Sequence, residues 1–165
     1  MTSRHEICRY SEQSLEASRK LKAKSQKPLI FEEKTDEKVR ALIEESVAAR
    51  EQAYAPYSKF AVGAALRSTS GQLFSGCNVE NASYSMATCA ERTAVVKAVS
   101  QGCRHFESVA VSAVLPDKFV SPCGSCRQIL SEFGDANLVV YLVRPDTRQV
   151  LTTTIGALLP LSFKF

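Results

Sequence analysis

Three of the six cysteines stand where helices are predicted to begin, and they constrain the fold more than any other feature of the sequence. Cys89 opens one predicted helix, and Cys123 and Cys126 form a C-x-x-C pair behind Pro122 at the start of another. A C-x-x-C pair at a helix start places both sulfurs on one side, about one turn apart. A structural zinc usually takes four protein ligands, whereas a catalytic zinc takes three and leaves a position for water. Cys89 has the only matching context for a third ligand, so we expect the two helix starts to meet around an open zinc site.

Glu91 follows Cys89 by two residues, and this spacing constrains the backbone at Cys89. Within a regular helix of 3.6 residues per turn, the two side chains would point about 200° apart. They can converge only if Cys89 lies at the helix entry, where the chain is not yet helical. Glu91 can then exchange protons with a water activated by the metal. The sequence therefore predicts Glu91 as the catalytic acid and base rather than as a zinc ligand.

Arg92 directly follows Glu91 and is predicted to balance the charge of the site. Three thiolates on Zn²⁺ leave a net negative charge, which opposes the formation of hydroxide. Each helix N-terminus that points at the site contributes roughly half a positive charge. We expect Arg92 to add a full positive charge by donating a hydrogen bond to a thiolate.

The order of the predicted elements indicates one α/β domain. It reads helix, two strands, helix, strand, helix, two strands, which gives a mixed sheet of about five strands covered by helices. The turn at residues 145–148 is so short that the last two strands must be antiparallel. The predicted elements span residues 36–53, 60–67, 73–79, 89–100, 106–114, 122–133, 138–143 and 149–154, with a final helical turn at 155–159.

The net charge of +4 is confined to the N-terminal part of the chain. Residues 1–28 hold seven Lys or Arg against three Glu, whereas residues 29–165 hold fourteen basic and fourteen acidic residues. We therefore divide the chain into a basic arm, residues 1–35, expected to be partly disordered, and a catalytic domain, residues 36–165. Nucleic-acid binders usually carry a basic stripe on the folded domain, so the balanced domain favours a small substrate and no nucleic-acid partner.

Nothing in the sequence predicts a membrane or secretory protein. Its apolar stretches are far shorter than the roughly 20 residues of a membrane-spanning helix, and residues 1–10 lack the apolar core of a secretory signal. Clustered cysteines in such a chain more often bind metal than form disulfides. We expect a cytoplasmic protein, with nuclear or organellar targeting by the basic arm as the alternative.

Several segments of the predicted domain carry motifs that are jointly very specific. They are Asn-Val-Glu-Asn-Ala at 78–82, Cys-Ala-Glu-Arg-Thr-Ala at 89–94 and Pro-Cys-Gly-Ser-Cys-Arg-Gln at 122–128, supported by residues 55–65 and 158–160. Over roughly residues 36–165 the chain resembles the small homotetrameric cytidine deaminases of the three-cysteine, zinc-dependent type. The resemblance implies their three-layer fold and a Zn²⁺ cofactor held by Cys89, Cys123 and Cys126.

The resemblance also implies an activity and a set of substrate contacts. The activity is hydrolysis of cytidine and deoxycytidine to uridine and deoxyuridine with release of ammonia, as in pyrimidine salvage, by attack of zinc-bound hydroxide on C4. Asn78 and Glu80 would hold the ribose hydroxyls, and the Ala90 backbone would contact the pyrimidine. Some contacts would cross the subunit borders of a homotetramer. The implied substrate-binding residues are Phe60, Asn78, Glu80, Ala82, Tyr84, Ala90 and Phe163.

Other interpretations of these residues stay open. Each cysteine taken alone is more often a buried free thiol, and Phe60 and Phe163 are residue types found more often in cores than at ligands. Asn78 and Glu80 could be ordinary turn residues. The alternative functions are a deaminase of the same fold acting on blasticidin S or a polynucleotide base, and a non-catalytic zinc-stabilised binding module. A polynucleotide editor needs a positive groove with aromatic side chains, and a purely structural zinc site has no use for Glu91.

Overall fold

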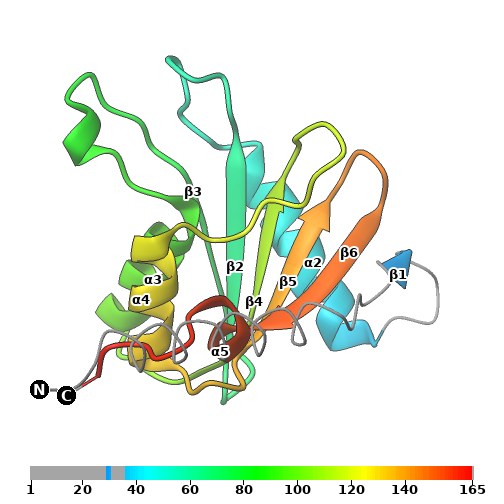
Figure 1. Ribbon diagram of the computed structural model, residues 1–165, viewed down its shortest axis with the longest axis vertical. Coiled ribbons are helices and arrows are strands. Elements are labelled where there is room, and N and C mark those ends of the chain that lie inside the picture. Colours follow the sequence, from blue (N-terminus) through cyan, green and yellow to red (C-terminus); the bar gives the residue numbers. More distant parts are fainter. Residues whose placement is uncertain (1–28, 31–35, 165) are drawn as a thin grey trace, which may run out of the picture.

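A six-stranded mixed sheet forms the middle layer of the molecule (Figure 1). The computed structural model describes residues 29–30 and 36–164. The strands lie in the order β1-β6-β5-β4-β2-β3; β4 and β5 are parallel, and all other neighbours are antiparallel. The strands are β1 (Leu29–Ile30), β2 (Val62–Ser68), β3 (Leu73–Cys77), β4 (Phe106–Ala113), β5 (Val139–Arg144) and β6 (Gln149–Thr154).

Helices cover both faces of the sheet and complete the three predicted layers (Figure 1). Helix α2 (Glu37–Arg50) packs on one face, and α3 (Ala90–Ser100) and α4 (Gly124–Phe133) pack together on the other. The short helix α5 (Ile155–Leu158) follows β6 and contacts α4. None of the described helices combines the length and the apolarity that crossing a bilayer requires.

The apolar core is divided by the sheet into two clusters. On one face, Leu42 and Ile43 of α2 pack against Ala65 and Ala110 of the sheet. The larger cluster lies on the other face, where α3 and α4 contribute Val95 and Leu130 among others. Burial of aliphatic side chains on both sides of the strands is what the near-continuous apolar sequences of β4 and β5 predict. The core therefore fixes α3 and α4 against the sheet.

The five predicted strands and four predicted helical segments are all present, and their ends differ by a few residues. Helix α2 ends at Arg50, three residues before the predicted end, and α4 begins at Gly124 rather than at Pro122. The sixth strand, β1, was not predicted; its two residues pair with Val150 and Gln149 at the edge of the sheet. The disorder expected for the arm concerns residues 1–28 and 31–35, which lie outside the described residues.

The topology explains why the two helix starts that carry cysteines meet. Strands β3 and β4 are both antiparallel to β2, so they run in the same direction. The C-terminal ends of β3 and β4 therefore lie at the same end of the sheet, and the segments that lead to α3 and α4 begin there. The loop of residues 51–61 enters β2 at this end as well. In Figure 1 this loop and the loop of residues 78–89 extend upward side by side beyond the sheet.

Candidate active site

Three cysteine sulfurs converge at the starts of α3 and α4. The sulfur atoms of Cys89, Cys123 and Cys126 all lie within 4.8 Å of one another, and those of Cys89 and Cys123 are 3.9 Å apart. Zinc–sulfur bonds of about 2.3 Å in tetrahedral geometry require sulfur atoms about 3.8 Å apart. The cluster of Cys89, Cys123 and Cys126 can therefore hold a metal ion of the size of zinc.

Two of these cysteines stand at N-cap positions without making a capping hydrogen bond through their side chains. Cys89 and Cys123 are the N-cap residues of α3 and α4, with extended φ and ψ angles of −73° and 153°, and −67° and 169°. N-cap side chains commonly accept a hydrogen bond from the first turn of the helix, but neither cysteine makes such a bond. Both thiols thus stay available for a metal, and both helix N-termini direct their partial positive charge at it.

Glu91 lies in the first turn of α3 and is almost completely buried, with 4% of its surface exposed. The extended backbone of Cys89 confirms the entry geometry that the two-residue spacing requires. Burial raises the pKa of the Glu91 carboxyl above its ordinary value, and negative charge at Cys89 raises it further. A carboxyl in such surroundings holds a proton at a higher pH than an exposed one, which suits a group that exchanges protons near neutrality.

Gly76 of β3 sets the distance between the sheet and the first turns of α3. A Cβ atom at this position would lie 2.6 Å from the backbone nitrogen of Ala94 and 2.9 Å from the carbonyl oxygen of Ala90. These distances are shorter than van der Waals contact, so only glycine lets α3 approach so closely. We infer that Gly76 sets the position of the first turn of α3, which carries Glu91, although no motif in the sequence marks Gly76 as a site residue.

Arg92 lies next to the cysteine cluster, and its guanidinium donates a hydrogen bond of 2.6 Å to the carbonyl oxygen of Ala87. Within the described residues Arg92 Nε has no hydrogen-bond partner, so the expected bond to a thiolate is not formed by that atom. The pKa of the Cys89 thiol is lowered to about 6, first by a hydrogen bond from Cys126 and also by the positive charge of Arg92. The same pairing raises the pKa of Cys126. The lowered pKa favours the thiolate form of Cys89, which has the positive charge of Arg92 beside it.

Asn78 and Glu80 hold the loop that leads into β2. The Asn78 amide accepts from the backbone nitrogen of Val62 at 2.8 Å and donates to the carbonyl oxygen of Phe60 at 2.9 Å. The Glu80 carboxylate accepts from the backbone nitrogens of Tyr57 and Ser58 at 2.9 and 3.2 Å and from the Ser58 hydroxyl. The Ser58 hydroxyl is the main reason why the pKa of Glu80 is lowered. An amide and a carboxylate can each make further hydrogen bonds, so both groups can still hydrogen-bond to the two hydroxyls of a diol.

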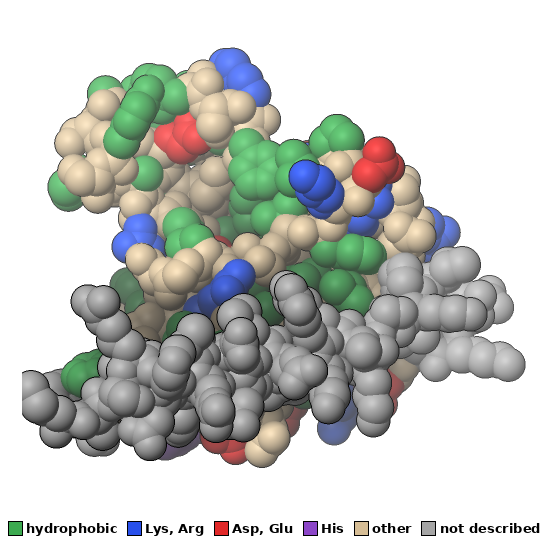
Figure 2. Space-filling model, viewed as in Figure 1, with side chains coloured by type: hydrophobic (Ala, Val, Ile, Leu, Met, Phe, Trp, Pro, Cys, Tyr) green, Lys and Arg blue, Asp and Glu red, His purple; other side chains and the backbone are tan. Residues whose placement is uncertain are grey.

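The loops of residues 51–61 and 78–89 form one lobe with a hollow between them. The hollow has a volume of about 370 Å³, and its lining includes Glu80, Tyr84 and Ala87, which is two residues before Cys89. Tyr84 is 77% exposed, and its ring meets that of Tyr57 edge to face. Figure 2 shows apolar side chains gathered on the surface of this lobe. Ala82 lies on the same loop and is exposed.

The other predicted contacts differ in position and burial. Ala90 is fully buried between Cys89 and Glu91, and Phe60 is partly buried. Phe163 lies on the C-terminal segment after α5 and is 65% exposed; its carbonyl oxygen accepts a hydrogen bond from Gln128 of α4 at 2.9 Å. The chain thus brings Ala90 to the cysteine cluster and leaves Tyr84 and Phe163 on its surface.

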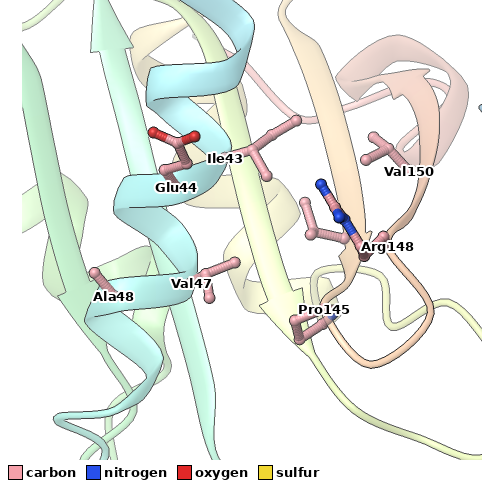
Figure 3. Close-up of a pocket in the computed structure, with 8 residues that line it drawn as sticks. Ile43, Glu44, Val47, Ala48, Pro145, Arg148 and Val150 are labelled. Carbon is pink, nitrogen blue, oxygen red and sulfur yellow. The ribbon is translucent and has the colours of Figure 1, made fainter. Parts of the chain in front are cut away.

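A second hollow is unrelated to this site. It lies between α2 and the β5–β6 hairpin, on the face of the sheet opposite α3 and α4, and has a volume of about 330 Å³ (Figure 3). Ile43, Val47 and Val150 contribute apolar walls, and Glu44 and Arg148 lie on the rim. It holds no candidate catalytic residue.

Comparison with known proteins agrees with this geometry. Residues 36–142 match the family model described as the cytidine and deoxycytidylate deaminase zinc-binding region. The fold and the cysteine cluster define a zinc-dependent deaminase. The chain belongs to the cytidine and deoxycytidylate deaminase family.

Individual relatives refine the comparison. The chain is 52% identical over 127 residues to a cytidine deaminase of Sporosarcina psychrophila, covering 76% of this chain and 90% of that protein. The crystal structure of a cytidine deaminase from Burkholderia pseudomallei superposes with a TM-score of 0.71 at 48% identity, over 75% of this chain and 98% of that one. A blasticidin-S deaminase of Bacillus cereus is 31% identical over 146 residues, covering 84% of this chain and 94% of that protein.

Proposed function

We propose that this protein hydrolyses the amino group of cytidine and deoxycytidine, giving uridine or deoxyuridine and ammonia. The observation that carries the proposal is the buried Glu91 carboxyl in the first turn of α3, next to three sulfurs that lie within 4.8 Å of one another. A purely structural metal site would need a fourth protein ligand and would have no use for a buried carboxyl. Cys89, Cys123 and Cys126 are the zinc ligands in this proposal, and Glu91 is the catalytic residue.

The chemistry depends on proton transfers that Glu91 is placed to perform. Cys89, Cys123 and Cys126 would hold the zinc ion, which would act as a Lewis acid and make water nucleophilic near neutral pH. Glu91 takes a proton from the water that attacks C4 and delivers it to ring N3. It then carries the second proton to the amino group, which leaves as ammonia. Its raised pKa suits both directions of transfer, because the carboxyl must bind and release a proton within one cycle.

The positive groups around the cluster counter its negative charge. Three thiolates exceed the charge of a zinc ion by one unit, and Arg92 supplies one positive charge next to Cys89. The N-termini of α3 and α4 add their partial charges. Arg92 is therefore the charge-balancing residue of the site.

Recognition of the nucleoside is assigned to the lobe beside the cysteine cluster. Asn78 and Glu80 present donor and acceptor atoms that match the hydroxyls of a ribose, and they are held in place by the backbone at residues 57–62. Phe60 would pack on the base, and the Ala90 backbone would contact the pyrimidine ring. A free nucleoside with unsubstituted sugar hydroxyls, rather than a polynucleotide, is the substrate that this arrangement favours.

We further propose a homotetramer in the cytoplasm, with each site completed by a neighbouring subunit. Tyr84, Met86 and Phe163 expose between 65% and 77% of their surface, and groups of exposed apolar side chains often mark contacts between proteins. Ala82 and Tyr84 from one subunit and Phe163 from another would then close the substrate site. Burial of these side chains between subunits accounts for their exposure in the single chain.

Blasticidin S is the second candidate substrate, since the chain is 31% identical to a deaminase of that antibiotic. The higher identity to cytidine deaminases and the Asn78 and Glu80 pair favour cytidine. Zinc-loaded protein should be incubated separately with cytidine, deoxycytidine, blasticidin S and a cytosine-containing DNA strand, with ammonia measured in each case. We expect ammonia from the first two. Turnover of blasticidin S or DNA without turnover of either nucleoside would contradict the proposal.

A further inference from the structure

Arg127 is the residue after Cys126 on α4, and its side chain turns back toward the other cysteine of the pair. Its Nε donates to the carbonyl oxygen of Pro122 at 2.7 Å, and one Nη donates to the Ser121 hydroxyl at 3.0 Å. The other Nη donates to the carbonyl oxygen of Leu158, 31 residues along the chain, at 2.9 Å. One guanidinium thus joins the residues just before Cys123 to the end of α5.

The two cysteines of the C-x-x-C pair are held in different ways. Cys126 is fully buried inside α4, so the helix itself fixes its sulfur. Cys123 is exposed, and it is the last residue of the irregular segment that follows β4. The Cys123 carbonyl oxygen accepts from the backbone nitrogen of Arg127 at 2.9 Å, so α4 holds one side of this residue. The direction from which the chain enters Cys123 depends on the residues before it, and Pro122 has no backbone N–H with which to anchor that segment. Arg127 supplies the hydrogen bonds found at Ser121 and Pro122.

Helix α5, which provides the acceptor at Leu158, is itself anchored in the fold. Ile155 opens α5 and is 2% exposed, and its backbone nitrogen donates to the carbonyl oxygen of Leu138 at 3.0 Å. Thr154 caps the helix by accepting from the backbone nitrogen of Ala157 at 3.2 Å. Leu158, whose carbonyl oxygen receives Arg127, is the last residue of this anchored turn.

We propose that Arg127 is a positioning residue that sets the sulfur of Cys123 at zinc-binding distance from Cys89 and Cys126. It does so by holding the Ser121–Pro122 backbone against α5, and it touches neither the metal nor the substrate. The guanidinium reaches its three acceptors from three different nitrogens in one rigid plane. A lysine ammonium has the same charge but carries its donors on a single nitrogen, so it cannot reproduce the fork. The proposal rests on the assignment of Cys123 as a zinc ligand.

The test compares Arg127→Lys with the wild-type protein in the rate of zinc release to an excess of a coloured chelator. Loss of a group that orients a ligand typically weakens metal binding by 10-fold or more, so we expect R127K to release zinc about 10 times faster. Arg67→Lys is the matched control. Arg67 is buried and, like Arg127, donates to backbone carbonyl oxygens, those of Lys38 and Gly71, outside the cysteine cluster.

The control separates positioning from general stability. R67K should lower the midpoint of thermal unfolding and leave zinc release unchanged. If R127K releases zinc at the wild-type rate, or if R67K accelerates release as much as R127K does, the positioning role is wrong. If R127K does not fold, Ser121→Ala replaces it in the test, because this change removes one acceptor of Arg127. Faster zinc release by S121A then supports the positioning role of Arg127, and release at the wild-type rate contradicts it.

The same experiment keeps this inference apart from the proposed function. Wild-type protein that holds one zinc per chain and deaminates cytidine supports the function, whatever R127K does. Wild-type protein that binds no zinc contradicts the ligand assignment itself, before any variant is compared.

Discussion

Replacing Gly76 with alanine should slow deamination by moving α3. The added Cβ would lie 2.6 Å from the backbone nitrogen of Ala94 and 2.8 Å from Cβ of Thr93, where ordinary contacts begin at 3.4 Å. Both atoms belong to α3, so the helix must retreat from β3 by about 0.8 Å, and Glu91 in its first turn moves with it. A displacement of about 1 Å at a reacting group can lower the rate about 100-fold. We therefore expect kcat for cytidine to fall by up to that factor.

The loss of rate must be separated from the loss of stability. Overpacking of this kind costs roughly 1–3 kcal/mol, which denaturant unfolding can measure beside steady-state kinetics. Leu42→Ala is a suitable control, because Leu42 belongs to α2 and is fully buried against the opposite face of the sheet, where its truncation costs roughly 2–5 kcal/mol. We expect the control to lose stability and keep kcat. A Gly76→Ala variant with wild-type kcat, or with no greater loss than the control, would refute the role given to Gly76.

Two further predictions concern charged groups around the site. Arg92→Gln should leave the fold intact and loosen zinc or slow turnover, because Cys89 loses its positive neighbour; unchanged zinc content and kcat would contradict this. Ser58→Ala should raise the pKa of Glu80 toward its ordinary value, which carboxyl NMR titration can follow. Since that pKa is lowered in the folded protein, the contact stabilises the fold above the pKa of the unfolded chain and is lost as the pH falls through the folded value. The stabilities of wild type and variant should therefore differ at neutral pH and converge in acid, and a constant difference would show that the contact does not depend on the charge of Glu80.

The parts of the site that local spacing determines could be predicted from the sequence. The distance of two residues between Cys89 and Glu91 already required an extended backbone at Cys89, and the structure has it. The C-x-x-C pair likewise placed Cys123 and Cys126 one turn apart at a helix start. These predictions succeeded because each depends on one helix end and a few consecutive residues.

The parts that depend on tertiary packing could not be predicted. The need for glycine at position 76 follows from where α3 crosses β3, and the role of Arg127 follows from Leu158, 31 residues away. Strand β1 has two residues, too few for any alternation, and it forms because β6 offers a free edge. Pro122 was expected inside the helix, but the extended backbone of Cys123 delays the helix start by two residues. For Gly76, Arg127 and β1, a partner distant in sequence decides the conformation.

The central claim is that the cysteines hold zinc while the separate Glu91 carboxyl moves the protons. Glu91→Gln tests this claim most directly, since the glutamine amide has the shape of the carboxyl but no ionisable proton. Because position 91 is buried, a side chain of the same shape keeps the packing around it. Zinc per chain should be measured by elemental analysis on the same sample whose production of uridine and ammonia from cytidine is followed. The account predicts wild-type zinc content with turnover reduced by at least about 100-fold, the lower range for loss of a general acid–base group. Substantial turnover by zinc-loaded E91Q would contradict it.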